Sequence, residues 1–158
     1  MTVATATIPV GVVGAGGMLA GELMRLLEGH PALGLAAAVG RRDLPLAETQ
    51  PHFRARADVA QTRAEMLDRL TGGPGALVLA LPHGESPAVW SELRGELGER
   101  AEELAVVDLA ADFRLRDTEL YSRAYGGEHP SPADLAGVTY GLPELDRESV
   151  KGARRVAA

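Results

Sequence analysis

A glycine-rich turn near the N-terminus restricts the fold of this chain more than any other feature of its sequence. Residues 10–23 read VGVVGAGGMLAGEL and contain five glycines, at the point where a valine-rich run gives way to a leucine-rich one. A short apolar run rich in valine is typical of a buried strand, and leucines at helical spacing indicate one face of a helix. The sequence therefore predicts a strand over residues 8–13, a tight turn, and a helix over residues 17–28.

The alternation of strands and helices continues along the first two thirds of the chain. Short apolar runs predict three more strands, at residues 33–39, 76–81 and 104–109. The spacing of apolar residues predicts a helix over residues 57–70 and another that ends near residue 96. For this second helix, Ser86 has the character of an N-cap and Pro87 that of the first helical residue. The pattern predicts an α/β fold, with a doubly wound, Rossmann-type sheet that is mostly parallel and covered by helices on both faces.

The last third of the chain follows a different pattern. Residues 112–146 mix charged residues, tyrosines, a Gly-Gly pair and three prolines, which predicts a loop-rich segment. Residues 146–154 are expected to form a short polar helix. A length of 158 residues fits a single domain, so we interpret residues 1–158 as one domain with the loop-rich segment at the ligand edge of its sheet.

Composition excludes several classes of function. The net charge of −6 argues against a nucleic-acid-binding surface. The absence of cysteine excludes a disulfide, a thiolate metal site and a thiol nucleophile within these residues, and no metal site is expected. No apolar run approaches the ~20 residues that span a bilayer, and the N-terminus lacks the features of a secretory signal. The expectation is a cytoplasmic protein without a membrane partner.

The glycine-rich turn lies where a doubly wound fold binds a dinucleotide. Gly14 permits the tight turn, and Gly16 and Gly17 allow backbone amides to approach a diphosphate at the positive end of the helix. Ala20 and Gly21 are small enough for close helix–strand packing. The alternative is a glycine-rich turn that binds nothing. The residues expected at the cofactor in this turn are Gly14, Ala15, Gly16, Gly17, Met18, Leu19 and Ala20.

The end of the second strand predicts which dinucleotide is bound. Arg41 and Arg42 occupy the place where arginine favours the 2′-phosphate of NADP and an acidic residue favours NAD. Asp43 beside them weakens the distinction, and an exposed basic turn is the alternative. We predict NADP(H) as the cofactor.

Two further clusters follow the third and fourth strands, at the edge where such sheets bind ligands. His83 is predicted to face the nicotinamide or its ribose, although it is also compatible with an ordinary loop histidine. Arg114 is a candidate clamp for an anionic substrate, with Asp112 orienting it. The alternative for these two residues is a structural ion pair.

Together these clusters resemble the N-acetyl-gamma-glutamyl-phosphate reductases of arginine biosynthesis, within the group that contains aspartate-semialdehyde dehydrogenase. The motifs that carry the resemblance are VGAGGMLAGEL (13–23), ALPHGES (80–86), VVDLAADFRL (106–115), GGEHP (126–130) and YGLPEL (140–145). The similar reductases that act on N-acetyl-aminoadipyl phosphate in lysine biosynthesis share them. The resemblance implies NADPH-dependent reduction of an acyl phosphate to a semialdehyde, with Leu81, Pro82 and His83 at the cofactor. It also implies a homo-oligomer for the full-length enzyme.

In the family, a cysteine thiolate attacks the acyl phosphate and a histidine acts as general acid and base. By resemblance, both residues are expected beyond Ala158, in a catalytic and dimerising domain that these residues do not include. The resemblance therefore predicts a fragment that binds cofactor without turnover and contributes no catalytic residue. Two other interpretations remain: a nucleotide-binding regulatory or interaction module, and an NADP enzyme that uses His83 or Tyr140 instead of a thiol.

Overall fold

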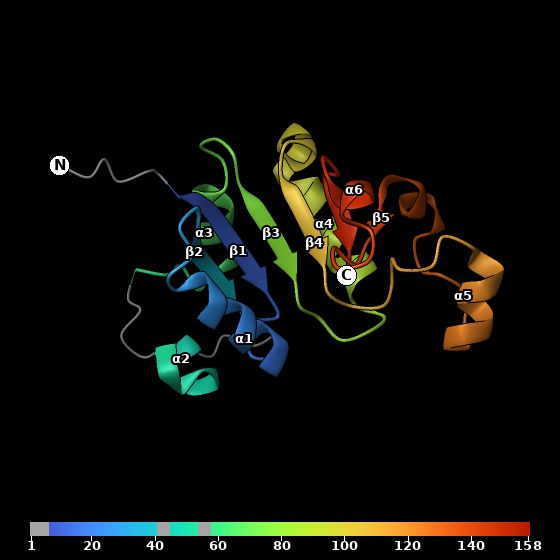
Figure 1. Ribbon diagram of the computed structural model, residues 1–158. Coiled ribbons are helices and arrows are strands. Elements are labelled where there is room, and N and C mark those ends of the chain that lie inside the picture. The colour runs from blue at the N-terminus through green and yellow to red at the C-terminus, as the bar shows by residue number, and fades with distance from the viewer. Residues whose placement is uncertain (1–6, 41–44, 54–57) are drawn as a thin grey trace. The chain divides into compact units, whose positions relative to one another are not determined.

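The computed structural model describes residues 7–40, 45–53 and 58–158 (Figure 1). The fold class is α/β, as predicted, and every strand pairing within the two parts described below is parallel. The chain forms two compact units, residues 1–80 and residues 81–158, and each is described by itself. Within the described residues, no helix is long and apolar enough to cross a membrane.

The first unit contains three parallel strands. The central strand β1 (Ile8–Val13) pairs with β2 (Leu33–Val39) on one side and with β3 (Ala76–Leu79) on the other. Helix α1 (Met18–Leu27) connects β1 to β2, and α3 (Arg63–Arg69) precedes β3. The two connections run in opposite directions across the sheet, and right-handed crossovers then place α1 and α3 on opposite faces. The order β2-β1-β3 puts a topological switch point between β1 and β3, beside the glycine-rich turn.

Helix α3 is shorter than the predicted helix over residues 57–70. Its N-cap is Thr62, whose hydroxyl accepts a hydrogen bond from the backbone N–H of Glu65, while the Glu65 carboxylate accepts one from the backbone N–H of Thr62. This reciprocal capping box satisfies amides that a helix start otherwise leaves unpaired, and it fixes where the helix begins.

A short segment between β2 and α3 packs against the glycine-rich turn. It consists of α2 (Leu46–Thr49) and the 3-10 helix η1 (Pro51–Phe53), with Gln50 between them. Leu46 and Phe53 are buried and anchor the two ends of this segment. The backbone N–H of Gln50 donates to Leu46 O (2.7 Å), and its carbonyl accepts from Phe53 N (2.9 Å). The position of Gln50 is therefore set by its neighbours on both sides.

The second unit begins with α4 (Ser86–Leu97) and continues through η2 (Gly98–Glu102) to β4 (Ala105–Asp108). Strand β6 (Arg155–Ala157) lies between β4 and β5 (Thr139–Tyr140). Sequence analysis predicted neither β5 nor β6. Both are very short and lack a continuous apolar run, so no periodic signal marks them.

The segment predicted to be loop-rich contains more helix than its composition indicates. Helix α5 (Thr118–Tyr125) begins at Asp117, whose carboxylate accepts hydrogen bonds from the first-turn amides of Glu119 and Leu120, and ends at Gly126 in the left-handed region (φ 79°). The 3-10 helix η3 (Pro132–Gly137) follows. The polar helix predicted over residues 146–154 is confined to α6 (Arg147–Val150).

Each unit has its own apolar core, built mainly from aliphatic side chains. The buried residues of the first unit include Val10, Val12, Met24, Ala37, Met66, Leu70, Leu77 and Leu79. Those of the second unit include Trp90, Leu93, Leu104, Val106, Phe113, Leu135 and Val138. These cores hold the strand ends, from which the candidate site residues emerge, in fixed positions.

Candidate functional site

The turn after β1 uses several of its own amides to hold its shape. Gly14 has φ of 88°, the left-handed conformation that a tight turn requires of glycine. The N–H groups of Gly14 and Ala15 both donate to the carbonyl of Val39, at 2.9 and 3.1 Å, and the N–H of Gly17 donates to the carbonyl of Gly14 at 3.2 Å. These three amides face inward and are unavailable to a ligand.

The remaining amides of the turn form the anion-binding candidate. Met18, Leu19 and Ala20 belong to the first turn of α1, where helical geometry supplies no acceptor for their N–H groups. The N-cap, Gly17, has no side chain that could cap them. Among the described residues, the N–H of Gly16 likewise has no backbone acceptor. Sequence analysis predicted that the amides of both Gly16 and Gly17 can approach a diphosphate. In the structure the N–H of Gly16 is free to do so, whereas the N–H of Gly17 is bonded to the carbonyl of Gly14. The four unpaired amides and the helix dipole suit a diphosphate.

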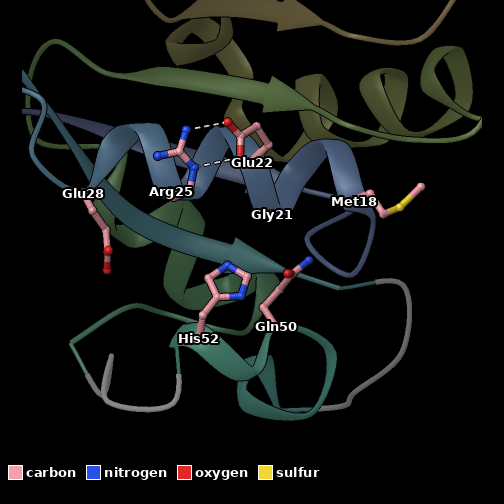
Figure 2. A pocket seen from close by; sticks show the side chains of 7 residues that line it. All are labelled: Met18, Gly21, Glu22, Arg25, Glu28, Gln50 and His52. Carbon is pink, nitrogen blue, oxygen red and sulfur yellow. Dashed lines mark hydrogen bonds and ion pairs between the residues drawn. The ribbon is translucent and has the colours of Figure 1, made fainter.

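A groove of about 490 Å³ runs along α1 beside this turn (Figure 2). Its residues are Met18, Gly21, Glu22, Arg25, Glu28, Gln50 and His52. The Arg25 guanidinium forms a two-pronged ion pair with the Glu22 carboxylate, at 2.8 and 2.6 Å. Gln50 approaches α1 from below at the level of Gly21. An added Cβ at Gly21 would meet Gln50 rather than a strand, so the small residue predicted here serves a helix–glutamine contact.

Arg41 and Arg42, the residues predicted to select NADP, lie outside the described residues, as does Asp43. The selection of NADP over NAD by these arginines therefore stays a prediction.

In the second unit, Asp112 organises a cluster of polar and aromatic side chains. Its side chain is fully buried, and its two carboxylate oxygens accept hydrogen bonds from the N–H of Gly84 at 2.9 and 3.1 Å. The Tyr121 hydroxyl donates to Oδ1 at 3.3 Å, and Nδ1 of His83 lies 3.2 Å from the same oxygen. A carboxylate only accepts, so Nδ1 of His83 carries a proton that points to Asp112. The His83 side chain is 40% exposed.

Aromatic rings from α5 and the following loop support this arrangement. The ring of Tyr125 lies 4.4 Å from that of His83, and Tyr121 lies 4.9 Å from Tyr125. His129 contacts Tyr121 (4.6 Å), accepts a hydrogen bond from Ser131 N at Nδ1, and donates from Nε2 to the carbonyl of Asp112. Burial and the nearby Asp112 carboxylate raise the pKa of Tyr121, so its hydroxyl remains a donor. Sequence analysis assigned no role to Tyr121, which no local pattern marks, or to His129, although His129 lies in the GGEHP motif (126–130).

Asp112 and Arg114 have separate partners. Nε of Arg114 donates to the carbonyl of Ala158 at 3.0 Å, and Nη2 donates to the carbonyl of Leu109 at 3.1 Å. Asp112 instead binds Gly84, Tyr121 and His83. Neither the predicted orienting contact nor the alternative ion pair between these two residues forms in the structure. The Arg114 guanidinium binds the carbonyl of Ala158, the residue after β6, whereas the Asp112 carboxylate contacts His83.

Ser86 takes a different role from the predicted N-cap. The N-cap of α4 is Glu85, and the Ser86 hydroxyl donates to Oδ1 of Asp108 at 2.7 Å. Asp108 is the last residue of β4, is only 3% exposed, and also accepts from Ala110 N. Its Oδ2 has no hydrogen-bond partner among the described residues. Burial raises the pKa of Asp108, against the lowering effect of the Ser86 hydrogen bond.

A raised pKa makes the stability of the fold depend on pH in a specific direction. The folded state holds the Asp108 proton more tightly than the unfolded state, so Asp108 favours folding at low pH and opposes it once the carboxyl ionises. The free energy of unfolding of the wild type should fall, relative to that of Asp108→Asn, as the pH rises above about 4. Urea unfolding at several pH values measures this. Ser86→Ala should extend the fall to higher pH; parallel curves for wild type and Asp108→Asn would contradict the assignment.

The fold and the turn after β1 define a dinucleotide-binding domain of the Rossmann type. The chain belongs to the semialdehyde dehydrogenase, NAD binding domain family, whose model matches residues 9–153. A nicotinamide dinucleotide is therefore its cofactor, and the turn after β1 supplies amides that fit the diphosphate of such a molecule.

The curated relatives are reductases of amino-acid phosphates. The chain is 37% identical over 150 residues to the LysW-L-2-aminoadipate 6-phosphate reductase of Deinococcus radiodurans, covering 94% of this chain and 40% of that protein. It is 38% identical over 151 residues to the N-acetyl-gamma-glutamyl-phosphate reductase of Polynucleobacter asymbioticus, covering 94% of this chain and 41% of that protein. The chain thus spans about two fifths of the length of the curated relatives that it matches.

Proposed function

We propose that this chain is the NADP-binding part of an acyl-phosphate reductase, which converts N-acetyl-gamma-glutamyl phosphate to the semialdehyde. The observation that carries the proposal is the set of unpaired amides at the start of α1, behind a glycine N-cap. An aminoadipyl phosphate is the alternative substrate, because the similar protein of Deinococcus radiodurans is named for LysW-L-2-aminoadipate 6-phosphate. Both substrates are acyl phosphates, so the reaction class is common to the two alternatives.

In this proposal the cofactor supplies the hydride, and the residues of this chain bind and orient it. The amides of Gly16, Met18, Leu19 and Ala20 hold the diphosphate, and Arg41 and Arg42 select the 2′-phosphate. Leu81, Pro82 and His83 are assigned to the cofactor by resemblance. Arg114 is assigned to the phosphate of the substrate on the same basis. The sequence contains no cysteine, so the thiol nucleophile of the family has to be supplied from outside these residues.

The proposal is tested by titrating the chain with NADPH and with NADH while following the fluorescence of the cofactor. NADPH should bind at least about tenfold more tightly than NADH, because a guanidinium–phosphate pair contributes more than about 1.4 kcal/mol. Arg41→Ala with Arg42→Ala should weaken NADPH and leave NADH unchanged. NADP⁺ mixed with phosphate and either semialdehyde should not be reduced by the chain alone.

Each arm of this titration has an outcome that contradicts part of the proposal. Equal affinities for NADPH and NADH would refute the preference for NADP. No binding of either cofactor would favour a regulatory or interaction module. Reduction of NADP⁺ by the chain alone would point to an enzyme without a thiol, with His83 or Tyr140 at its centre.

A further inference from the structure

Gln50 makes a specific contact with the glycine-rich turn that neither the sequence motifs nor the family match assigns. Its side chain is buried, with the residue only 6% exposed. Nε2 donates to the carbonyl of Ala15 at 3.0 Å and to the carbonyl of Gly17 at 2.9 Å. An amide nitrogen has two hydrogens, so these two carbonyls use its full donor capacity.

The two carbonyls belong to particular peptide units of the turn. In a trans peptide the C=O and the following N–H point in opposite directions. The carbonyl of Ala15 shares its peptide unit with the N–H of Gly16, and the carbonyl of Gly17 shares its unit with the N–H of Met18. Gln50 therefore binds two of the four peptide units whose N–H groups are unpaired, those of Gly16 and Met18. Gln50 does not contact the peptide units whose N–H groups belong to Gly14, Ala15 and Gly17. The first two of these N–H groups donate to the carbonyl of Val39 in β2, and the third donates to the carbonyl of Gly14.

We propose that Gln50 is a positioning residue for the diphosphate of the cofactor. By binding the carbonyl of Ala15, and that of Gly17 together with the N–H of Gly21, it holds the N–H groups of Gly16 and Met18 on the opposite side, where they can donate to an anion. The residue type matters, because a glutamate here would face two carbonyl oxygens with acceptors only. This inference rests on the proposed binding of a dinucleotide by the same turn.

Gly21 provides an independent way to displace Gln50. A Cβ added at Gly21 would lie 2.6 Å from Oε1 and 3.0 Å from Nε2 of Gln50, closer than such contacts allow, so the carboxamide has to move. Gly21→Ala is therefore expected to disturb the turn through Gln50, even though alanine favours the helix more than glycine does. In a Gln50→Ala background the clash disappears, and the same substitution should then be harmless.

The first test compares ligands with and without a diphosphate. Gln50→Met keeps the length of the side chain and removes both donors, and it should weaken NADPH by about tenfold, since two hydrogen bonds that preorganise the turn are lost. Adenosine 2′-monophosphate, which lacks the diphosphate, should bind Gln50→Met and wild type equally. Thr71→Val is the control: it removes an exposed hydroxyl that donates to the carbonyl of Asp68, a bond that involves neither the turn nor the segment of Gln50, so NADPH affinity should not change.

The second test is a cycle of Gly21→Ala, Gln50→Ala and the double variant, read as NADPH affinity. Gly21→Ala should weaken NADPH several-fold in the wild-type background and have no effect in the Gln50→Ala background. Failure of the wild type to bind NADPH would overturn both this inference and the proposed function. Binding by the wild type with equal affinity in Gln50→Met, or equal weakening of NADPH and adenosine 2′-monophosphate, would overturn the role of Gln50 alone.

Discussion

Replacing Gly17 with aspartate is expected to abolish dinucleotide binding while making the domain slightly more stable. Gly17 is the N-cap of α1, with φ −83° and ψ 160°, a conformation that aspartate adopts readily. A Cβ at this position meets nothing closer than Gly14 O at 3.7 Å, so the substitution fits. The new carboxylate would accept from the first-turn amides of α1, which contributes about 0.5 kcal/mol of stability over glycine. It would also occupy the amides that the diphosphate needs and repel its charge, lowering NADPH affinity by more than about 100-fold.

This prediction is specific because Gly17→Asp should raise the thermal stability of the domain while it lowers the affinity for NADPH. Fluorescence titration with NADPH and thermal unfolding measure the two effects on the same sample. Gly29→Asp adds the same charge beyond the other end of α1, where a Cβ meets no atom within 4 Å, and should leave NADPH affinity unchanged. Retention of NADPH binding by Gly17→Asp would show that the diphosphate is held elsewhere.

The parts of this fold that could be predicted from the sequence are those with a strong local period. Strands β1 and β2 have the predicted bounds, because each is a short apolar run that is followed by a glycine. The turn at Gly14 was predictable because a left-handed residue between a strand and a helix calls for glycine. The start of α3 was set by side chains instead of periodicity, and the predicted helix was too long.

The candidate site was harder to predict, because its contacts join residues far apart in the chain. Asp112 was recognised as a candidate, but its nearest charged neighbour in the sequence, Arg114, is not its partner. Its contact with His83 spans a turn and a helix–strand unit, and no spacing rule connects the two positions. Gln50 lies in a segment without any motif and was not recognised at all. Tertiary packing selects such pairs, and one sequence by itself carries little signal for them.

Substitution of Asp112 by alanine is expected to destabilise the second unit more than any other single change in the polar cluster. The buried carboxylate accepts from Gly84 N, the Tyr121 hydroxyl and Nδ1 of His83. Its removal leaves the buried Tyr121 hydroxyl without this acceptor, whereas Gly84 and His83 are exposed and can bind water. The expected cost is about 2–4 kcal/mol, because a buried donor without a partner costs about 1–3 kcal/mol and each hydrogen bond lost by an exposed donor costs about 0.5–1 kcal/mol. Urea unfolding of the wild type and the variant measures this cost.

Two other substitutions serve as controls. Tyr121→Phe removes one donor and leaves the carboxylate its other partners, so it should cost less than about 1.5 kcal/mol. Asp146→Ala, at the exposed N-cap of α6, should cost about 1 kcal/mol or less. A cost for Asp112→Ala no greater than that for Asp146→Ala would mean that the donors find other partners and that Asp112 does not hold His83 in place.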